Sequence, residues 1–363
     1  MINIQELLRK NIRELKPYSS ARDEYTGSIG IFLDANENSF GSIPEGKLNR
    51  YPDPHQSAIK EKLAKIKGAN PENIFIGNGS DEAIDIVIRA FCEPGKDSVL
   101  IMPPTYGMYK VAADINDVQT IDIPLTEDFQ IETEKVISAI AEFTKIIFIC
   151  SPNNPSGNLL DRNSIYLILS TFNGIVVVDE AYIDFSNEES WIKELDNFNN
   201  LVVLQTFSKA WGLANIRVGM AFGNSEVISV MNKIKYPYNV NGVSQKMIIE
   251  ALDNEVKKNK VVKSINTERE KLIKELHNFS LIEYVYKSDA NFLLAKVNNA
   301  NKIYNYLLEN KIIVRNRSNM IHCKDCLRFT IGTEYENTKL IETLKRYEEE
   351  KWKKYYSLIE TEQ

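Results

Sequence analysis

Short apolar segments that alternate with helical patterns constrain the fold of this chain more than any other feature. Five of them lie between about residues 70 and 250: IFIG (74–77), SVLIM (98–102), KIIFIC (145–150), GIVVVDE (174–180) and LVVLQTF (201–207). Strands that are apolar on both faces are typical of parallel sheets covered by helices on both sides. The sequence therefore predicts an α/β fold in which a mostly parallel sheet is flanked by helices.

The pattern changes after about residue 253, where a long charged helix precedes three further strand-like segments, 291–297, 311–316 and 326–332. A chain of 363 residues is also too long for one ordinary core. We therefore expect a second, smaller α+β domain. The predicted division is an N-terminal arm over residues 1–48 that joins the small domain, a large domain over 49–255 and the small domain over 256–363.

Composition and charge exclude several classes of protein. Apolar residues make up 43% of the chain and charged residues 26%, which are ordinary values for a globular protein. The formal net charge of -6 argues against general nucleic-acid binding. Neither a secretory signal nor an apolar run long enough to span a membrane is present, so we expect a cytoplasmic protein with no membrane partner.

The four cysteines are sparse, as is usual in a reducing compartment. Cys323 and Cys326 form one CxxC, but no second CxxC or histidine pair completes a zinc site. No metal is therefore expected, and the sequence assigns no role to these two thiols.

Chemically capable residues follow the predicted strands, and ligands of open α/β sheets bind beyond the carboxyl ends of the strands. The glycine-rich turn GNGSDE can present backbone N–H groups to a phosphate. Thr206 and Ser208, with the guanidinium of Arg217, can also bind a phosphate. The candidates at the strand ends are Ser80, Asp81, Tyr106, Asn154, Asp179, Tyr182, Thr206, Ser208, Lys209 and Arg217.

Each candidate also has a purely structural explanation. Lys209 lies among small, apolar and aromatic residues in TFSKAWGLANIRVG, so it is either a snorkelling lysine or a desolvated reactive amine. Asp179 directly follows three valines and either caps a turn or carries a buried charge with a partner. Tyr106 either packs in its proline-rich turn or stacks on a planar ligand. The joint order of the candidates favours pyridoxal phosphate, which needs a lysine, a carboxylate, a stacking ring and a phosphate cradle.

The same residues carry a resemblance to the fold-type I pyridoxal-phosphate aminotransferases. SPNNPSG, VVVDEAY and TFSKAWGLANIRVG mark that broad family. FLDANENSFGS, NRYPDP, GNGSDEAID, PPTYGMY, NFLL, IIVRN and CLRFTIG are similar to the histidinol-phosphate aminotransferases within it. The chain departs in small ways, such as Asn78 where that family often has arginine, and no departure removes a catalytic group.

The resemblance implies a role for each residue around the cofactor ring. Lys209 matches the lysine that bonds to the cofactor and then moves the proton. Asp179 matches the partner of the ring nitrogen. Tyr182 and Asn154 match the donors to the ring oxygen, and Tyr106 matches the stacking ring.

Phosphate binding is implied in the same way. Ser80 and Asp81 match the loop that offers N–H groups to the cofactor phosphate, and Thr206, Ser208 and Arg217 complete that cradle.

The resemblance also implies a homodimer, since Tyr51 matches a tyrosine that reaches the cofactor phosphate of the neighbouring subunit. Tyr18, Asn36, Arg315 and Arg328 match positions that bind substrate anions. Alternation in CLRFTIG puts Arg328 on the face opposite Leu327 and Phe329.

The implied reaction is amino transfer between L-histidinol phosphate and 2-oxoglutarate, giving imidazole acetol phosphate and L-glutamate in histidine biosynthesis. An aromatic amino-acid aminotransferase is the alternative. A decarboxylase of a phosphorylated amino acid is a further rival within the fold. From a different class of protein, a ligand sensor attached to a DNA-binding module is also considered. The segment before DANENS is expected to be too short for a winged helix, and the net charge is negative.

Overall fold

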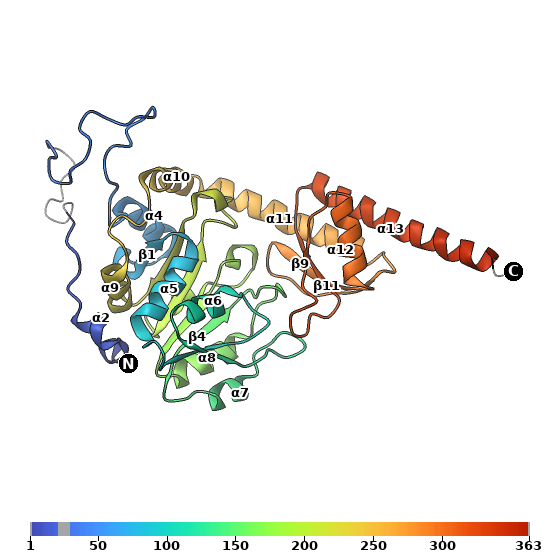
Figure 1. The fold of residues 1–363 in the computed structure, drawn as a ribbon, viewed down its shortest axis with the longest axis horizontal. Coiled ribbons are helices and arrows are strands. Elements are labelled where there is room, and N and C mark those ends of the chain that lie inside the picture. The colour runs from blue at the N-terminus through green and yellow to red at the C-terminus, as the bar shows by residue number, and fades with distance from the viewer. Residues whose placement is uncertain (1, 21–29, 362–363) are drawn as a thin grey trace.

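A computed structural model describes residues 2–20 and 30–361 of the chain. Its larger sheet, in the left half of Figure 1, has seven strands. Their order is β1-β7-β6-β5-β4-β2-β3. β7 runs antiparallel to both β1 and β6, and the neighbouring pairs among the other strands are parallel. The strands are β1 (Ile74–Gly77), β2 (Ser98–Ile101), β3 (Gln119–Asp122), β4 (Thr144–Cys150), β5 (Ile175–Asp179), β6 (Leu201–Thr206) and β7 (Gly219–Gly223).

The five strands predicted between residues 70 and 250 are confirmed, and so is the mostly parallel α/β sheet. The prediction missed β3 and β7. β3 reads QTID and has no buried residue, so it lacks an apolar signal. β7 reads GMAFG, and glycine is depleted in strands, so its sequence does not indicate one.

Helices cover both faces of this sheet, which explains why its strands are apolar throughout. Side chains alternate between two cores: Val176 and Val178 of β5 point to one, and Ile175 and Val177 to the other. The first core is covered by α4 (Ser57–Lys67), α7 (Thr133–Ser138), α8 (Arg162–Thr171) and α10 (Gly242–Leu252). The second is covered by α5 (Gly79–Phe91), α6 (Met108–Ile115) and α9 (Ser225–Ile234). Short 3₁₀ helices lie at η1 (Pro71–Asn73), η2 (Ile183–Phe185), η3 (Trp191–Glu194) and η4 (Ala214–Ile216).

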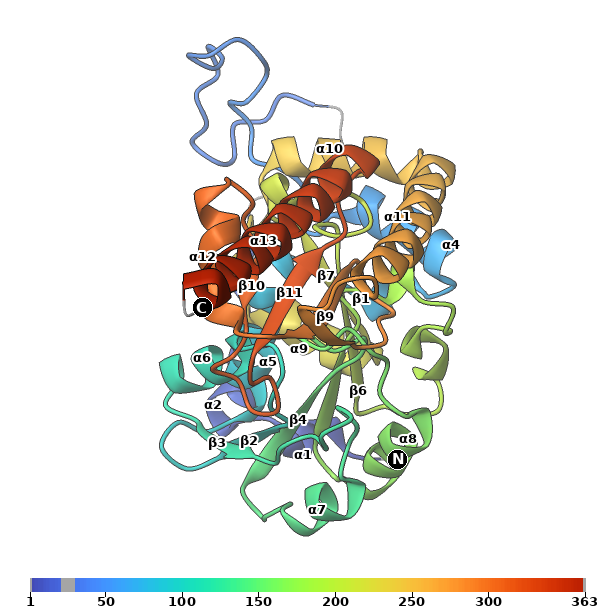
Figure 2. The same ribbon diagram turned by 90° about the vertical axis from the view of Figure 1, so that its right-hand side faces the viewer.

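The N-terminal helices α1 (Ile4–Leu7) and α2 (Lys10–Glu14) pack on the second core through Ile4, Leu8 and Ile12. Figure 1 shows them on the opposite side of the large sheet from the C-terminal strands. The apolar side chains of α1 and α2 are thus buried against the helices of the large sheet, while the assignment of residues 1–48 as an arm of the small domain stays a prediction. The chain from residue 30 to about residue 48 stands away from the body (Figure 2), and Phe40 in it is fully exposed.

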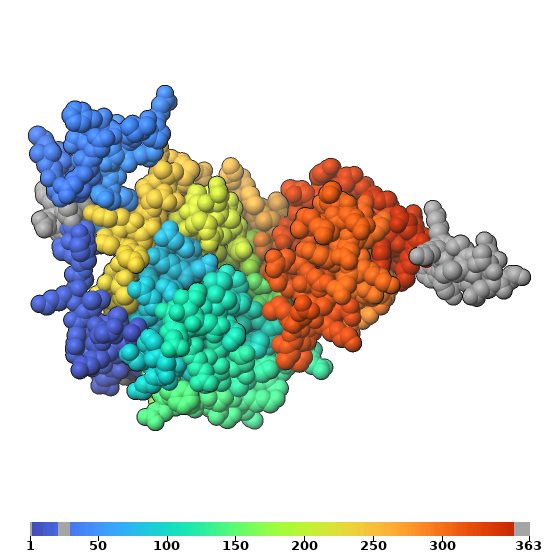
Figure 3. Space-filling view, viewed as in Figure 1, coloured from blue at the N-terminus to red at the C-terminus, as the bar shows by residue number. Residues whose placement is uncertain are grey.

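The second sheet is antiparallel, with the order β10-β11-β9-β8. Its strands are β8 (Ile282–Val285), β9 (Phe292–Val297), β10 (Arg315–Asn316) and β11 (Cys326–Thr330). It packs with α11 (Glu255–Leu276), α12 (Ala300–Glu309) and α13 (Glu334–Thr361) around its own core. In Figure 3 this part of the chain, coloured orange and red, lies beside the residues that form the larger sheet and its helices. The residue numbers that divide the chain stay a prediction.

Two expectations for this region can be compared with the structure. Leu327 and Phe329 are buried while Arg328 is half-buried, so the predicted alternation is confirmed. β10 covers only the last two residues of the strand expected over 311–316. The strand begins later than expected because the chain first has to leave α12. The N–H of Ile312 bonds to the Leu307 carbonyl, and Lys311 has a φ of 63°, so these residues form the turn that ends the helix. Within the described residues, no helix is both long and apolar enough to cross a bilayer.

Candidate active site

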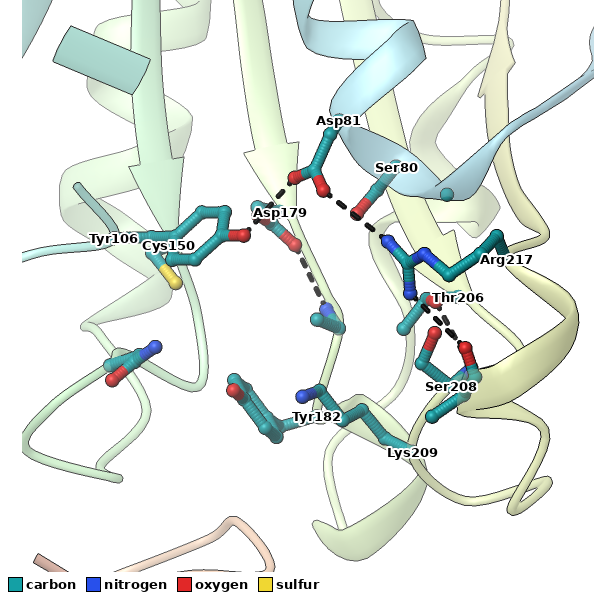
Figure 4. Close-up of a pocket in the computed structure, with 14 residues that line it drawn as sticks. Ser80, Asp81, Tyr106, Cys150, Asp179, Tyr182, Thr206, Ser208, Lys209 and Arg217 are labelled. Atoms are coloured by element: carbon teal, nitrogen blue, oxygen red, sulfur yellow. Dashed lines mark hydrogen bonds and ion pairs between the residues drawn. The ribbon is translucent and has the colours of Figure 1, made fainter. Parts of the chain in front are cut away.

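One pocket at the carboxyl ends of the large sheet gathers the residues predicted around a cofactor (Figure 4). Lys209 and Tyr182 lie on one side of it and Tyr106 on another, with Arg217 across the opening. The predicted residues that line it are Ser80, Asp81, Tyr106, Asn154, Asp179, Tyr182, Thr206, Ser208, Lys209 and Arg217.

Asp179 is the last residue of β5 and supplies a buried carboxylate to the pocket. Its exposed fraction is 2%. Oδ1 accepts from the N–H of Ala181 at 3.0 Å, and Oδ2 accepts from the Tyr109 hydroxyl at 2.7 Å. Burial raises the pKa of Asp179 to about 6, against the lowering effect of these two hydrogen bonds. A buried carboxylate of this kind is ready to pair with a cationic ligand atom.

Lys209 follows β6 and has no carboxylate ion-pair partner among the described residues. Its Nζ lies 5.4 Å from the centre of the Tyr182 ring. Burial lowers the pKa of Lys209, and the positive charge of Arg328 lowers it further, while Asp179 opposes both. A lysine with a lowered pKa is the usual form of a reactive amine, so the position of Lys209 favours that reading over a snorkelling side chain.

The start of α5 forms the side of the pocket that suits a phosphate. Within the described part of the chain no side chain caps this helix, so its first N–H groups are left for a ligand. Gly79 has a φ of 73°, which glycine adopts without strain. The β7 residue Gly219 lies against this turn, and a Cβ there would be 2.2 Å from the nitrogen of Ser80.

Asp81 connects two walls of the pocket. Its Oδ1 accepts from the Tyr106 hydroxyl at 3.1 Å, and its Oδ2 lies 3.5 Å from Nη2 of Arg217. Arg217 itself has a φ of 53°, a conformation that non-glycine residues adopt at a cost. The side chain of Asp81 therefore holds the aromatic ring and the guanidinium in place.

The second sheet reaches the pocket through Arg328 of β11. Its guanidinium donates to Oδ1 of Asn154, in the loop after β4, and lies 5.0 Å from the ring of Phe292. Phe292 in turn contacts Tyr182 edge to face at 5.1 Å. Arg315 of β10 is paired directly with Arg328 in the strand register. Two of the predicted anion-binding residues thus lie together beside the pocket.

Besides Arg315 and Arg328, three further predicted residues do not line this pocket. Asn36 and Tyr51 line a separate hollow, where Tyr51 stacks on Tyr238 with ring centres 4.4 Å apart. Tyr18 lies on the N-terminal segment and is 75% exposed. Their predicted roles stay predictions, and none of the three lines the pocket of its own chain.

Tyr109 is a functional candidate that the sequence analysis missed. It is fully buried, stacks on Phe148 at 4.8 Å and donates to Asp179. PPTYGMY contains two tyrosines, and only Tyr106 was singled out. Nothing local distinguishes them, because the contact of Tyr109 with Asp179 joins positions 70 residues apart.

The donor set fits pyridoxal phosphate. The buried Asp179 can partner a protonated ring nitrogen, and the Lys209 amine can bond to an aldehyde. Tyr106 offers an aromatic face, and the uncapped start of α5 with Arg217 offers a phosphate cradle. The side-chain amide oxygen of Asn154 accepts a hydrogen bond from the Arg328 guanidinium, so the amide N–H groups are left as donors for a ligand.

Comparisons with known proteins agree with this geometry. The sequence model of the family described as Aminotransferase class I and II matches residues 32–344. A histidinol-phosphate aminotransferase from Cytophaga hutchinsonii is 52% identical over 345 residues, which cover 95% of this chain and 99% of the relative.

Two solved structures are similar in fold. The histidinol-phosphate aminotransferase of Clostridium acetobutylicum has a TM-score of 0.77 at 27% identity, over 84% of this chain and 92% of that one. The enzyme of the same name from Sinorhizobium meliloti, in complex with pyridoxal-5'-phosphate, has a TM-score of 0.77 at 20% identity. The match covers 93% of this chain and 98% of that one. The chain belongs to the class I and II aminotransferases and, within them, to the histidinol-phosphate aminotransferases.

Proposed function

We propose that this protein transfers the amino group of L-histidinol phosphate to 2-oxoglutarate, with pyridoxal phosphate as its cofactor, in histidine biosynthesis. The products are imidazole acetol phosphate and L-glutamate. The observation that carries the proposal is one pocket in which the lysine of lowered pKa, Lys209, and the buried carboxylate of Asp179 lie with an aromatic wall and a phosphate cradle. Relatives that carry this activity in their names are 52% and 54% identical over 95% of the chain.

When bound, pyridoxal phosphate supplies an aldehyde that bonds to amines and a ring that takes up electrons. The chain's own residues do the rest. Asp179 holds the proton at the ring nitrogen, because a buried carboxylate is stabilised by an adjacent cation. The Nζ of Lys209 accepts the proton that leaves the amine-bearing carbon of the donor, which a lowered pKa permits. Tyr182 and Asn154 donate to the ring oxygen, and Arg315 and Arg328 bind the anionic ends of the substrates.

The protein acts as a homodimer in this proposal, and Tyr51 reaches the cofactor phosphate of the neighbouring site. Several large apolar side chains support it, since Ile31, Leu33, Phe40 and Ile43 are at least 82% exposed. Tyr51 itself is half-exposed and lies outside the pocket of its own chain. The cytoplasm is the proposed location, in keeping with cysteines that are all free thiols.

The test is an absorbance spectrum of the cofactor-loaded protein before and after L-histidinol phosphate is added without an acceptor. Stoichiometric conversion of the cofactor band is expected, and 2-oxoglutarate should then restore it. Conversion with phenylalanine or tyrosine but not with L-histidinol phosphate would move the substrate to the aromatic amino acids. Release of carbon dioxide without glutamate would exclude transamination.

Lys209→Ala tests the role of this lysine in the same spectrum, and Lys258→Ala is its matched control. The Lys209→Ala variant should fold but lose both the band of lysine-bound cofactor and turnover. Lys258→Ala, which removes another lysine whose Nζ lies 2.9 Å from Asp184, should keep both. Turnover by Lys209→Ala would contradict the assigned role of the lysine.

A further inference from the structure

Beside the pocket, three arginines share one face of the strand pair β10–β11. Arg315 lies directly opposite Arg328 in the register, so their side chains point to the same side. The ladder continues one step beyond β10, because the N–H of Arg317 donates to the carbonyl of Cys326 at 2.9 Å. Side chains two residues apart on a strand share a face, so Arg317 joins Arg315 and Arg328.

Like charges directly opposite one another destabilise a strand pair unless something neutralises them. In the part of the chain that the structure describes, no carboxylate lies within ion-pair distance of any of the three guanidinium groups. Both Arg317 and Arg328 also have a buried Nε without a hydrogen-bond partner among the described residues. A buried donor left unpaired costs free energy that a ligand could recover. Three arginines with these unmet interactions suit an anion.

Arg317 interacts electrostatically with the two other arginines and with the pocket residue Tyr182. Burial lowers the pKa of Arg317 to about 10, and the charges of Arg328 and Arg315 add to this effect. Burial raises the pKa of Tyr182, and the positive charges of Arg328 and Arg317 both oppose that rise. The positive charge of Arg317 therefore acts on the same pocket residue, Tyr182, as that of Arg328.

The backbone holds Arg317 in place from both sides. Its carbonyl accepts from the N–H of Met320 at 2.9 Å, and the loop continues through turns that bring Cys323 to Met320 and Cys326 to Cys323. A side chain that leaves from a fixed backbone loses less freedom on binding than one on a mobile segment.

We propose that Arg317 is a specificity-determining residue of this site and binds the phosphate group of the amino donor together with Arg328 and Arg315. The inference rests on the proposed function, since it assigns the phosphorylated end of that donor. A phosphate monoester carries close to two negative charges and three acceptor oxygens, whereas a single guanidinium already pairs both oxygens of a carboxylate. Three arginines on one face suit a phosphate monoester. Arg317 thereby distinguishes the phosphorylated amine from its unphosphorylated counterpart.

The test compares the cofactor-loaded wild-type protein with Arg317→Met, Arg317→Lys and Lys324→Met. Lys324→Met removes one exposed positive charge from the same loop and serves as the control. The first measurement is the affinity for inorganic phosphate by calorimetry. In the loaded protein the phosphate of the cofactor occupies the cradle at the start of α5, so the cradle does not bind the added inorganic phosphate. Arg317→Met should weaken this affinity roughly tenfold to a hundredfold, as expected for charged hydrogen bonds. Arg317→Lys should be intermediate because the charge remains while the fork geometry is lost.

The second measurement is the half-reaction with L-histidinol phosphate and with L-histidinol. Arg317→Met should raise the apparent dissociation constant of the phosphorylated amine by the same factor and that of L-histidinol by less than about threefold, as for a surface charge. Lys324→Met should leave both unchanged, and thermal unfolding should show that every variant is folded.

Equal losses with both amines, or an unchanged affinity for inorganic phosphate, would overturn the assignment of Arg317. If the wild-type protein failed to convert L-histidinol phosphate, the proposed function would fall. The phosphate affinities of wild type and Arg317→Met would still decide whether Arg317 binds phosphate.

Discussion

The hydroxyl of Tyr109 donates a hydrogen bond to Oδ2 of Asp179 over 2.7 Å, and both side chains are buried. Tyr109 comes from α6 and Asp179 from the end of β5, so this bond fixes the carboxylate relative to a neighbouring helix. The bond lowers a pKa that burial otherwise raises. Tyr109 is thus a positioning residue that keeps Asp179 ionised without touching the pocket itself.

Removing that hydroxyl should make cofactor binding more sensitive to acid. In Tyr109→Phe the pKa of Asp179 should rise above about 6 by roughly one to two units, because a charged hydrogen bond is lost. The affinity for pyridoxal phosphate, measured by absorbance titration between pH 5 and 8, should therefore begin to fall at a higher pH than in wild type. The cofactor's own titrations are common to both proteins. Tyr306→Phe, whose hydroxyl bonds to Glu350, is the control, and coincident pH profiles would refute the role of Tyr109.

Asp179→Asn should stabilise the cofactor-free protein at neutral pH. The folded-state pKa of Asp179 is about 6 and the unperturbed value is 3.8, so wild type loses stability as the pH rises between these values. At pH 7 the variant should be more stable by up to about 3 kcal/mol, and the difference should vanish below pH 4. Urea unfolding of both proteins across this range measures it. A difference that does not change with pH would show that the carboxylate's charge is not the cause.

Gly219→Ala should damage the phosphate side of the pocket. Its Cβ would lie 2.2 Å from the nitrogen of Ser80 and 2.4 Å from the carbonyl carbon of Gly79, so the α5 turn would have to move. We expect a loss of about 1–3 kcal/mol in unfolding free energy, together with weaker cofactor binding. Gly223→Ala on the same strand is the matched control, since its nearest contact would be 3.4 Å. Equal behaviour of the two variants would contradict the steric argument.

Arg217→Met should lower the affinity for the cofactor while leaving the unfolding free energy nearly unchanged. The ion pair of Arg217 with Asp81 is largely exposed, so its loss should change the unfolding free energy by less than about 1 kcal/mol. A phosphate contact should nevertheless be lost, and cofactor affinity should fall roughly tenfold or more. Arg89→Met removes a comparable exposed pair with Asp85 and should leave cofactor affinity unchanged. An unaltered affinity in Arg217→Met would remove Arg217 from the cradle.

Most of the large sheet was predictable because a strand buried on both faces needs apolar residues at every position. β5 with its valines shows this clearly, and Asp179 at its end marked the pocket edge. β3 and β7 were missed because they carry no such signal: one is exposed and the other is glycine-rich.

The candidate site divides in the same way. Lys209, Asp179 and Arg217 could be named from the order of motifs along the chain, because Asp179 ends the predicted strand β5 and the other two lie in the motif that follows β6. Tyr109 and Arg317 could not, because their importance comes from contacts with residues far away in the chain. The position of α1 and α2 was also decided by tertiary packing, since Ile4, Leu8 and Ile12 are buried among residues far away in the chain.

The amino-acid sequence by itself determined the alternation of strands and helices, and with it the edge of the sheet where the chemical groups gather. Hydrophobic periodicity is a local property, so it can be read along the chain. Only the tertiary structure decided which charges and hydroxyls meet there. Burial and hydrogen bonding depend on the packing of distant elements, and these set the pKa of Asp179 and place three arginines on one face.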